Sequence, residues 1–165
     1  MNESGKTARA IFASGCFWGT EYHLSRVDGV ISTTVGYTGG HKENPTYEEV
    51  CTGTTGHAEA TEVIYDPVKV NFEQLTRLFF ETHDPTQLNR QGPDIGTQYR
   101  SGIFYLNAEQ KTVAEQLIIL LKEQGYDVVT EITRASEFWP AENYHQDYYA
   151  LRNGVPYCHV YKKKF

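Results

Sequence analysis

Short strand segments alternate with helical segments along most of this chain, and that order limits the possible folds more than any other feature. β-Branched and apolar residues between turn signals predict strands at 9–13, 30–37, 58–65, 99–106 and 128–132. Apolar residues at helical spacing, with capping residues beside them, predict helices at 17–25, 72–82 and 108–124. Strands interleaved with helices in this way predict an α/β (α+β) domain, in which helices pack on a mixed β-sheet.

Two segments are expected to be irregular. Residues 83–98 contain two prolines, two glycines and many polar side chains, and a loop of this length in a compact domain usually carries function. From Arg134 onward the chain is aromatic and irregular, with a helical turn expected near 142–151 and a C-terminal tail from 153 to 165.

The bulk composition narrows the class of protein. A chain of 165 residues is long enough for one core, so we expect a single domain spanning 1–165 and a monomer. A net charge of -6 argues against a nucleic-acid partner, and the basic run Lys162–Lys164 is interpreted as a solvated tail. Because no signal peptide or membrane-length apolar run is visible, we expect a cytoplasmic protein without a membrane partner.

Cys16 is the first candidate for chemistry. It follows a short apolar strand, precedes Phe17 and Trp18, and would sit in the first turn of a helix. The N–H groups and dipole at a helix start favour the reactive thiolate, although a buried structural cysteine is an equally ordinary use of this residue. Three widely spaced cysteines do not suggest a disulfide framework, and the six histidines form no familiar metal-ligand pattern, so we expect no metal site.

Glu59 is the second candidate, because it lies at the start of an apolar strand with alanine on both sides. If the carboxyl is buried, desolvation raises its pKa and makes it a general acid near neutral pH. The alternative is a solvent-facing strand residue. The strand phase alone leaves both interpretations open.

Tyr47, Tyr99 and Asp94 lie beside or within predicted loops rather than inside periodic apolar segments. A tyrosine there can donate its phenol proton in a pocket, but a core tyrosine with a satisfied hydroxyl is commoner. Asp94, between Pro93 and Ile95, could equally be a turn residue.

Taken together, five motifs make the chain resemble the peptide methionine sulfoxide reductase A family over nearly its whole length. They are Gly15-Cys16-Phe17-Trp18-Gly19, Pro45-Thr46-Tyr47-Glu48-Glu49-Val50-Cys51, Gly56-His57-Ala58-Glu59, Gly96-Thr97-Gln98-Tyr99-Arg100-Ser101 and Phe138-Trp139-Pro140-Ala141-Glu142. The resemblance implies a two-layer sandwich around a mixed sheet. It also implies reduction of methionine S-sulfoxide, free or in oxidised proteins and peptides, to methionine.

The resemblance assigns roles to individual residues. Cys16 falls at the nucleophile and Glu59 at the acid, while Phe17 and Trp18 form the apolar wall that receives the substrate methyl group. The polar positions around the sulfoxide oxygen fall on Tyr47, Asp94 and Tyr99. One departure is Pro93, which stands where the family has Asn, so Asp94 could be held differently.

Attack by Cys16 would leave a sulfenic acid that a second thiol must resolve. The resemblance favours Cys158 for this step, in a tail expected to be free to move, over Cys51, which is more readily explained by packing. It implies an intramolecular disulfide that thioredoxin, or dithiothreitol in vitro, reduces by thiol exchange, with no bound cofactor.

Two rival functions start from the same residues. His159 lies far downstream of Cys16, at a separation found in papain-like thiol hydrolases, although the local cysteine signature differs. A non-catalytic peptide-binding domain could use the same tyrosines and tryptophans. A requirement for a thiol reductant separates the reductase from both.

Overall fold

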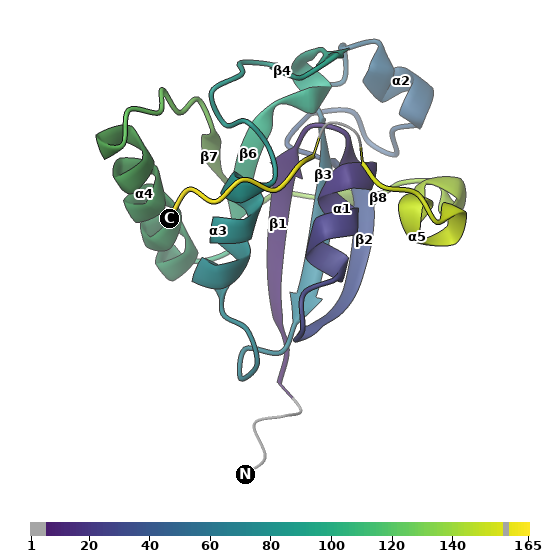
Figure 1. Cartoon of the computed structure of the whole chain (residues 1–165). Coiled ribbons are helices and arrows are strands. Elements are labelled where there is room, and N and C mark those ends of the chain that lie inside the picture. Colours follow the sequence, from purple (N-terminus) through teal and green to yellow (C-terminus); the bar gives the residue numbers. More distant parts are fainter. Residues whose placement is uncertain (1–5, 157–158) are drawn as a thin grey trace.

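The chain forms a mixed sheet with its long helices on one face. A computed structural model describes residues 6–156 and 159–165. The described strands form a six-stranded sheet in the order β7-β6-β1-β3-β2-β8, in which only β6 and β7 pair in parallel. Helices α1, α3 and α4 lie along one face of this sheet (Figure 1). The predicted α/β class and mixed sheet are therefore confirmed.

The elements have the following bounds. The strands are β1 (Ala8–Ser14), β2 (Val30–Thr38), β3 (Ala58–Tyr65), β4 (Arg90–Gln91), β5 (Asp94–Ile95), β6 (Ser101–Tyr105), β7 (Glu131–Arg134) and β8 (Phe138–Pro140). The helices are α1 (Phe17–Ser25), α2 (Tyr47–Cys51), α3 (Phe72–Glu81), α4 (Ala108–Glu123) and α5 (Tyr148–Arg152), with 3₁₀ turns η2 (Thr97–Tyr99) and η3 (Asn143–His145).

Alternation along the two central strands divides the core between the faces of the sheet. Ala10 and Phe12 of β1 pack under the helices, with Val63 and Tyr65 of β3. A smaller cluster on the opposite face is formed by Ile11 and Ala13 of β1 and Ala58 and Ala60 of β3, together with Phe104 and Phe138. Because side chains alternate, Glu59 lies on the helix-covered face with Val63 and Tyr65.

Local capping explains where the longer helices start and stop. The side chain of Asn71 accepts a hydrogen bond from the backbone of Gln74, whose side chain accepts from the backbone of Asn71. Asn107 caps α4 in a similar way, and Gly125, with φ of +100°, follows its end. Capping groups satisfy N–H donors that have no partner within the helix. The predicted starts of both helices are confirmed.

Two predicted strands are displaced in the structure, and two further elements were not predicted. The predicted strand at 128–132 is shifted to β7, because the N–H of Val129 bonds the carbonyl of Pro85 in the long loop instead of a sheet neighbour. The predicted strand at 99–106 begins only at Ser101, after a 3₁₀ turn that holds Tyr99. The 83–98 loop contains the small β4–β5 hairpin, and β8 adds an edge strand.

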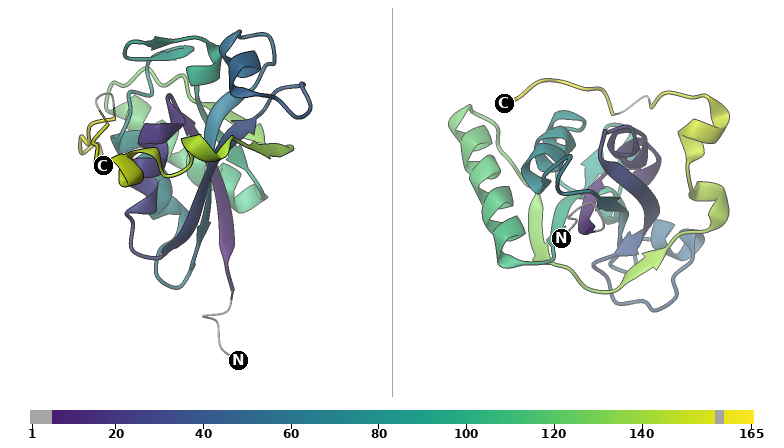
Figure 2. Two further views of the ribbon diagram at one scale, coloured as in Figure 1. Left: turned by 90° about the vertical axis from the view of Figure 1, so that its right-hand side faces the viewer. Right: turned by 90° about the horizontal axis from the view of Figure 1, so that it is seen from below.

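The C-terminal tail packs on the helices from His159 onward. Figure 2 shows it crossing the helix layer toward α4. The N–H of Lys162 donates to the carbonyl of Glu81, and Gln124 donates to the carbonyl of Lys164. The expectation of a solvated basic run is therefore wrong for Lys164, which is buried with its Nζ near the carbonyl of His83.

Candidate active site

Cys16 lies in the turn between the central strand β1 and helix α1. Gly15, with φ of +96°, allows the sharp exit from the strand, in a backbone conformation that side chains disfavour. Cys16 is the N-cap residue, and its carbonyl accepts the N–H of Gly19. The helix and its predicted bounds are confirmed, and the partly buried thiol sits at the helix start, where the dipole favours negative charge.

Glu59 lies directly against this helix start. The backbone N–H of Phe17 donates to its Oε1 over 3.2 Å, and only 1% of the residue is exposed. Its Oε2 is buried without a hydrogen-bond partner among the described residues. Burial raises the pKa of Glu59 to about 8, and the nearby charge of Asp94 adds to this, while the Phe17 N–H opposes it. The open question of strand phase is resolved: Glu59 is buried, and its raised pKa favours the protonated acid near neutral pH.

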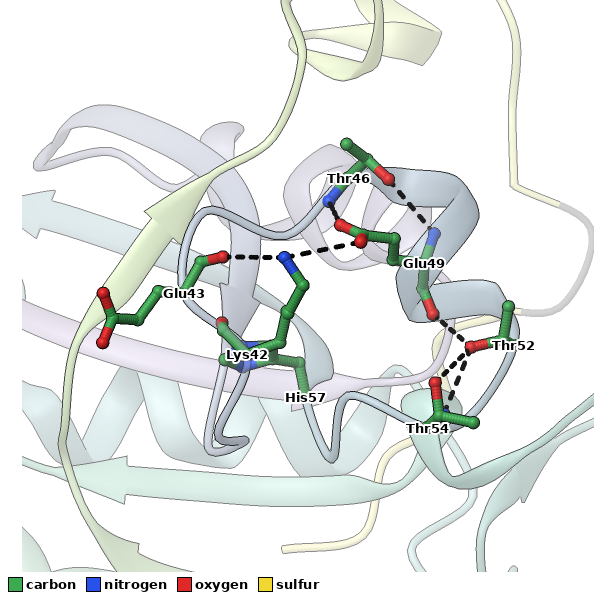
Figure 3. Close-up of polar contacts among 7 residues, drawn as sticks. All are labelled: Lys42, Glu43, Thr46, Glu49, Thr52, Thr54 and His57. Carbon is green, nitrogen blue, oxygen red and sulfur yellow. Dashed lines mark hydrogen bonds and ion pairs between the residues drawn. The ribbon is translucent and has the colours of Figure 1, made fainter.

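Tyr47 is the first residue of α2, and Figure 3 shows the contacts between Thr46 and Glu49 that cap this helix. Thr46 and Glu49 form a reciprocal capping box there, and Lys42 reaches back to Glu49 over 3.4 Å. The backbone N–H of Tyr47 donates to Oε2 of Glu142 over 3.0 Å. Burial raises the pKa of Tyr47, and the charge of Glu59 raises it further, so the phenol keeps its proton.

Tyr99 and Asp94 approach the same place from the long loop. Tyr99 ends the 3₁₀ turn η2, and Asp94 begins the short strand β5. Burial raises the pKa of Tyr99, followed by the charges of Glu59, Cys51, Asp94 and Cys16. Tyr99 therefore lies close enough to Asp94, Glu59 and Cys16 for their charges to act on it, although these residues come from segments that are far apart in sequence.

The two aromatic residues after the cysteine face a larger aromatic group. Phe17 is fully buried, and its ring centroid lies 5.7 Å from that of Tyr37 and 6.5 Å from that of Tyr47. Trp18 is partly exposed and stacks on Tyr148 with a centroid distance of 3.7 Å. The site thus combines an apolar aromatic surface with phenol and carboxyl donors.

Sequence reasoning gave no role to two residues that organise the site, although Glu142 ends one of the five motifs. The Glu142 carboxylate accepts the Tyr37 hydroxyl on one oxygen and the Tyr47 N–H on the other. His145 accepts the indole N–H of Trp18 at its Nδ1 over 3.1 Å. The dense mixture of polar and aromatic residues after Pro140 was the available signal.

The other two cysteines are Cys51 in α2 and Cys158 near the C-terminal end of the sequence. Cys51 ends α2, where its exposed thiol shares a hydrogen bond with the Tyr47 hydroxyl, and burial of part of the group raises its pKa. Cys158 lies outside the described residues. Among the residues that are described, no cluster of three or more His, Cys, Asp or Glu side chains could hold a metal ion.

His159, the residue on which the hydrolase alternative rests, has a defined environment. Its Nε2 donates to the carbonyl of Ser14 over 2.5 Å, and its ring lies against Gly19. Burial lowers the pKa of His159 to about 4. The imidazole is therefore engaged with the backbone beneath the Cys16 turn.

Among the helices within residues 6–156 and 159–165, none has the length and apolar character that a membrane span requires.

Comparison with known proteins decides among the alternatives. A family model described as peptide methionine sulfoxide reductase matches residues 8–165. The peptide methionine sulfoxide reductase MsrA of Nautilia profundicola is 53% identical over 150 residues, which cover 91% of this chain and 87% of that protein.

Solved structures agree with this assignment. The crystal structure of Mxr1 from Saccharomyces cerevisiae in reduced form is 36% identical, with a TM-score of 0.88 over 96% of this chain and 93% of that one. Mxr1 in complex with Trx2 is 26% identical, with a TM-score of 0.65 over 96% and 91% of the two chains. The present chain belongs to the peptide methionine sulfoxide reductase family and is a peptide-methionine (S)-S-oxide reductase, which reduces methionine sulfoxide to methionine.

Proposed function

We propose that Cys16 is the nucleophile and Glu59 the proton donor of this reductase. The Cys16 thiolate attacks the sulfoxide sulfur, and Glu59 protonates the oxygen, which is a poor leaving group until then. The oxygen passes to Cys16 as methionine departs, so the substrate sulfur is reduced and Cys16 is oxidised to a sulfenic acid. The single observation that carries this proposal is the buried Oε2 of Glu59, without a partner, beside the turn that bears Cys16.

The remaining site residues are proposed to bind the sulfoxide group. Tyr47 and Tyr99 keep their phenol protons at neutral pH and can donate them to the sulfoxide oxygen. Asp94 raises the pKa of Glu59 and so favours its acid form. Phe17 and Trp18 supply the apolar surface for the methyl group, in keeping with their place in the aromatic group.

Resolution of the sulfenic acid is assigned to Cys158. Its thiol attacks the Cys16 sulfur, water leaves, and an intramolecular disulfide forms. A dithiol then reduces this disulfide by exchange, and we propose thioredoxin as that reductant, with dithiothreitol as a substitute in vitro. The solved complex of the related Mxr1 with Trx2 supports this choice. Cys51 remains the alternative resolving thiol, and peptide mapping after one turnover distinguishes the two linkages.

We further propose that residues 1–165 act as one cytoplasmic, monomeric catalytic domain on oxidised proteins and peptides, without a bound cofactor. Size-exclusion chromatography with light scattering tests the monomer. Turnover by protein purified in the presence of a chelator, with a thiol as the only addition, tests the cofactor statement.

The first experiment measures methionine formed from the separated S- and R-epimers of N-acetylmethionine sulfoxide, with dithiothreitol. Turnover of the S-epimer alone is expected, and Cys16→Ser should abolish it. An active Cys16→Ser variant would overturn the assignment of the nucleophile. If folded wild-type protein turned over neither epimer, the proposed chemistry itself would fail.

A further inference from the structure

Trp18 is held by two different contacts in the structure. The near-parallel stack on Tyr148, with 7° between the ring planes, determines the plane of the indole. Stacking alone leaves the indole able to rotate within that plane. The hydrogen bond from its N–H to Nδ1 of His145, over 3.1 Å, removes that freedom because it points in one direction.

The partner, His145, lies at the centre of the aromatic group. Its ring centroid is 4.4 Å from that of Tyr47, 5.2 Å from that of Phe17 and 4.1 Å from that of Tyr144. Only 1% of the residue is exposed. A phenylalanine could fill the same space and make the same ring contacts, so packing alone does not explain a histidine here.

The protonation of the ring reinforces this point. Because Nδ1 accepts the indole hydrogen, the neutral ring carries its proton on Nε2. That Nε2 is buried and has no hydrogen-bond partner among the described residues. An unpaired buried donor opposes folding, so a histidine at this position costs stability that a phenylalanine would not.

The segment that carries His145 is itself tied to the rest of the site. The side-chain amide of Gln146 bonds both the N–H and the carbonyl of Val35 in β2. The N–H of Asp147 donates to Oε1 of Glu21 in α1 over 2.7 Å. The two residues that follow His145 are therefore hydrogen-bonded to the sheet and to the helix that bears Trp18.

We propose that His145 is a positioning residue that sets the rotation of the Trp18 indole and thereby the fit of the pocket to a methyl sulfoxide. The inference rests on the proposed role of Trp18 as part of the methyl-binding wall. His145 acts through Trp18 and takes no part in proton transfer. Its loss should thus weaken substrate binding and size selectivity more than it slows the chemical step.

The kinetic test compares His145→Phe, which keeps the bulk but removes the acceptor, with His145→Asn, whose amide oxygen can replace Nδ1. The substrates are the S-sulfoxides of N-acetylmethionine and N-acetylethionine, which differ by one methylene. For His145→Phe we expect KM for the methyl substrate to rise about three- to tenfold, the range of one lost hydrogen bond, with kcat nearly unchanged. The ratio of kcat/KM for methyl over ethyl should fall, and His145→Asn should restore much of both.

A spectroscopic test reports on the indole directly. The chain has two tryptophans, so Trp139→Phe leaves Trp18 as the only indole. In that background, His145→Phe should shift the fluorescence emission of Trp18 and change its near-ultraviolet circular dichroism, while far-ultraviolet spectra show that the fold is intact.

Different results would contradict the positioning role of His145 and the methyl-binding role of Trp18. If Trp18→Phe lowers the methyl-to-ethyl ratio and a folded His145→Phe does not, the positioning role of His145 is wrong. A His145→Asn variant as impaired as His145→Phe would also overturn it, because bulk or shape would then be responsible. If Trp18→Phe itself leaves the ratio unchanged in an active enzyme, the proposed role of Trp18 fails, and the inference with it.

Discussion

The backbone N–H of Phe17 and the Oε1 of Glu59 are joined by a hydrogen bond of 3.2 Å. Phe17 follows the cysteine directly, so this one contact sets the distance between the turn of the nucleophile and the carboxyl group. It also occupies one carboxyl oxygen and leaves the proton of the acid form to the other, Oε2. Nucleophile and acid are thereby placed together by backbone geometry.

The acid role predicts a large loss of activity for Glu59→Gln. The amide keeps an acceptor for the Phe17 N–H but cannot release a proton, so kcat/KM should fall by about 10²–10⁴-fold, the usual range for removal of a general acid. In the wild type, activity that depends on the acid form should decline as pH rises through about 8. Glu62→Gln is the matched control, since Glu62 lies on the same strand and pairs with Arg9. Equal rates for Glu59→Gln and the control would contradict the assignment.

The same carboxyl predicts an unusual dependence of stability on pH. The pKa of Glu59 rises from 4.5 in the unfolded chain to about 8 in the folded one, so the folded state holds this proton more tightly. The contribution of Glu59 to stability is therefore greatest below pH 4.5 and falls as pH rises toward 8. Each unit of pKa difference corresponds to about 1.4 kcal/mol.

Urea unfolding of wild type and Glu59→Gln at pH 5, 6.5 and 8 measures this effect. The free energy of unfolding of the variant, relative to wild type, should increase with pH. A difference that is the same at all three values would show that the carboxyl is not protonated in the folded enzyme.

The parts of the fold that sequence predicted well carry their own local signals. The bounds of α1 and β3 agree residue for residue with the predictions, because glycines precede them and Asp66-Pro67 follows β3. The edge strand β8 has three residues, one of them Pro140, and so offers no periodicity to detect. Such a strand forms because β2 supplies a partner, which is a tertiary effect.

The site residues also divide into those that have a local sequence signal and those that depend on tertiary contacts. Cys16 and Glu59 are conspicuous in sequence because each is a reactive group in an apolar stretch. Glu142 and His145 become meaningful only through contacts with Tyr37 and Trp18, which lie 105 and 127 positions earlier in the chain. The burial of His145 was also out of reach, since the irregular segment that bears it has no repeating pattern.

The close contact between Gly19 and the ring of His159 predicts that a larger residue at position 19 lowers stability. A Cβ at position 19 would overlap the ring of His159, which is buried and bonded to the carbonyl of Ser14. Gly19→Ala should therefore destabilise the protein by about 1–3 kcal/mol, the usual effect of overpacking. Thermal unfolding measures the loss, which reports the overlap and not backbone strain, because Gly19 lies inside helix α1 and not at a positive φ.

The double variant Gly19→Ala/His159→Ala makes this prediction specific. Removal of the imidazole leaves room for the new methyl group, so the double variant should lose less stability than the sum of the two single variants. Strictly additive losses would mean that the added methyl group at position 19 does not clash with the ring of His159.

Two matched capping boxes allow the contribution of α2 to the site to be isolated. Thr46 caps α2 beside Tyr47, and Asn71 caps α3 through the same reciprocal arrangement with Gln74. Thr46→Ala and Asn71→Ala should each lower the free energy of unfolding by about 1 kcal/mol, the typical value for such a cap. Only Thr46→Ala should also raise KM for the methionine S-sulfoxide, because it loosens the turn that holds Tyr47, whose phenol is close enough to Glu59 for its pKa to be raised by that carboxylate. Parallel unfolding and steady-state assays test this. A KM that changes equally in both variants would show that Thr46 affects KM only through the stability of the whole protein.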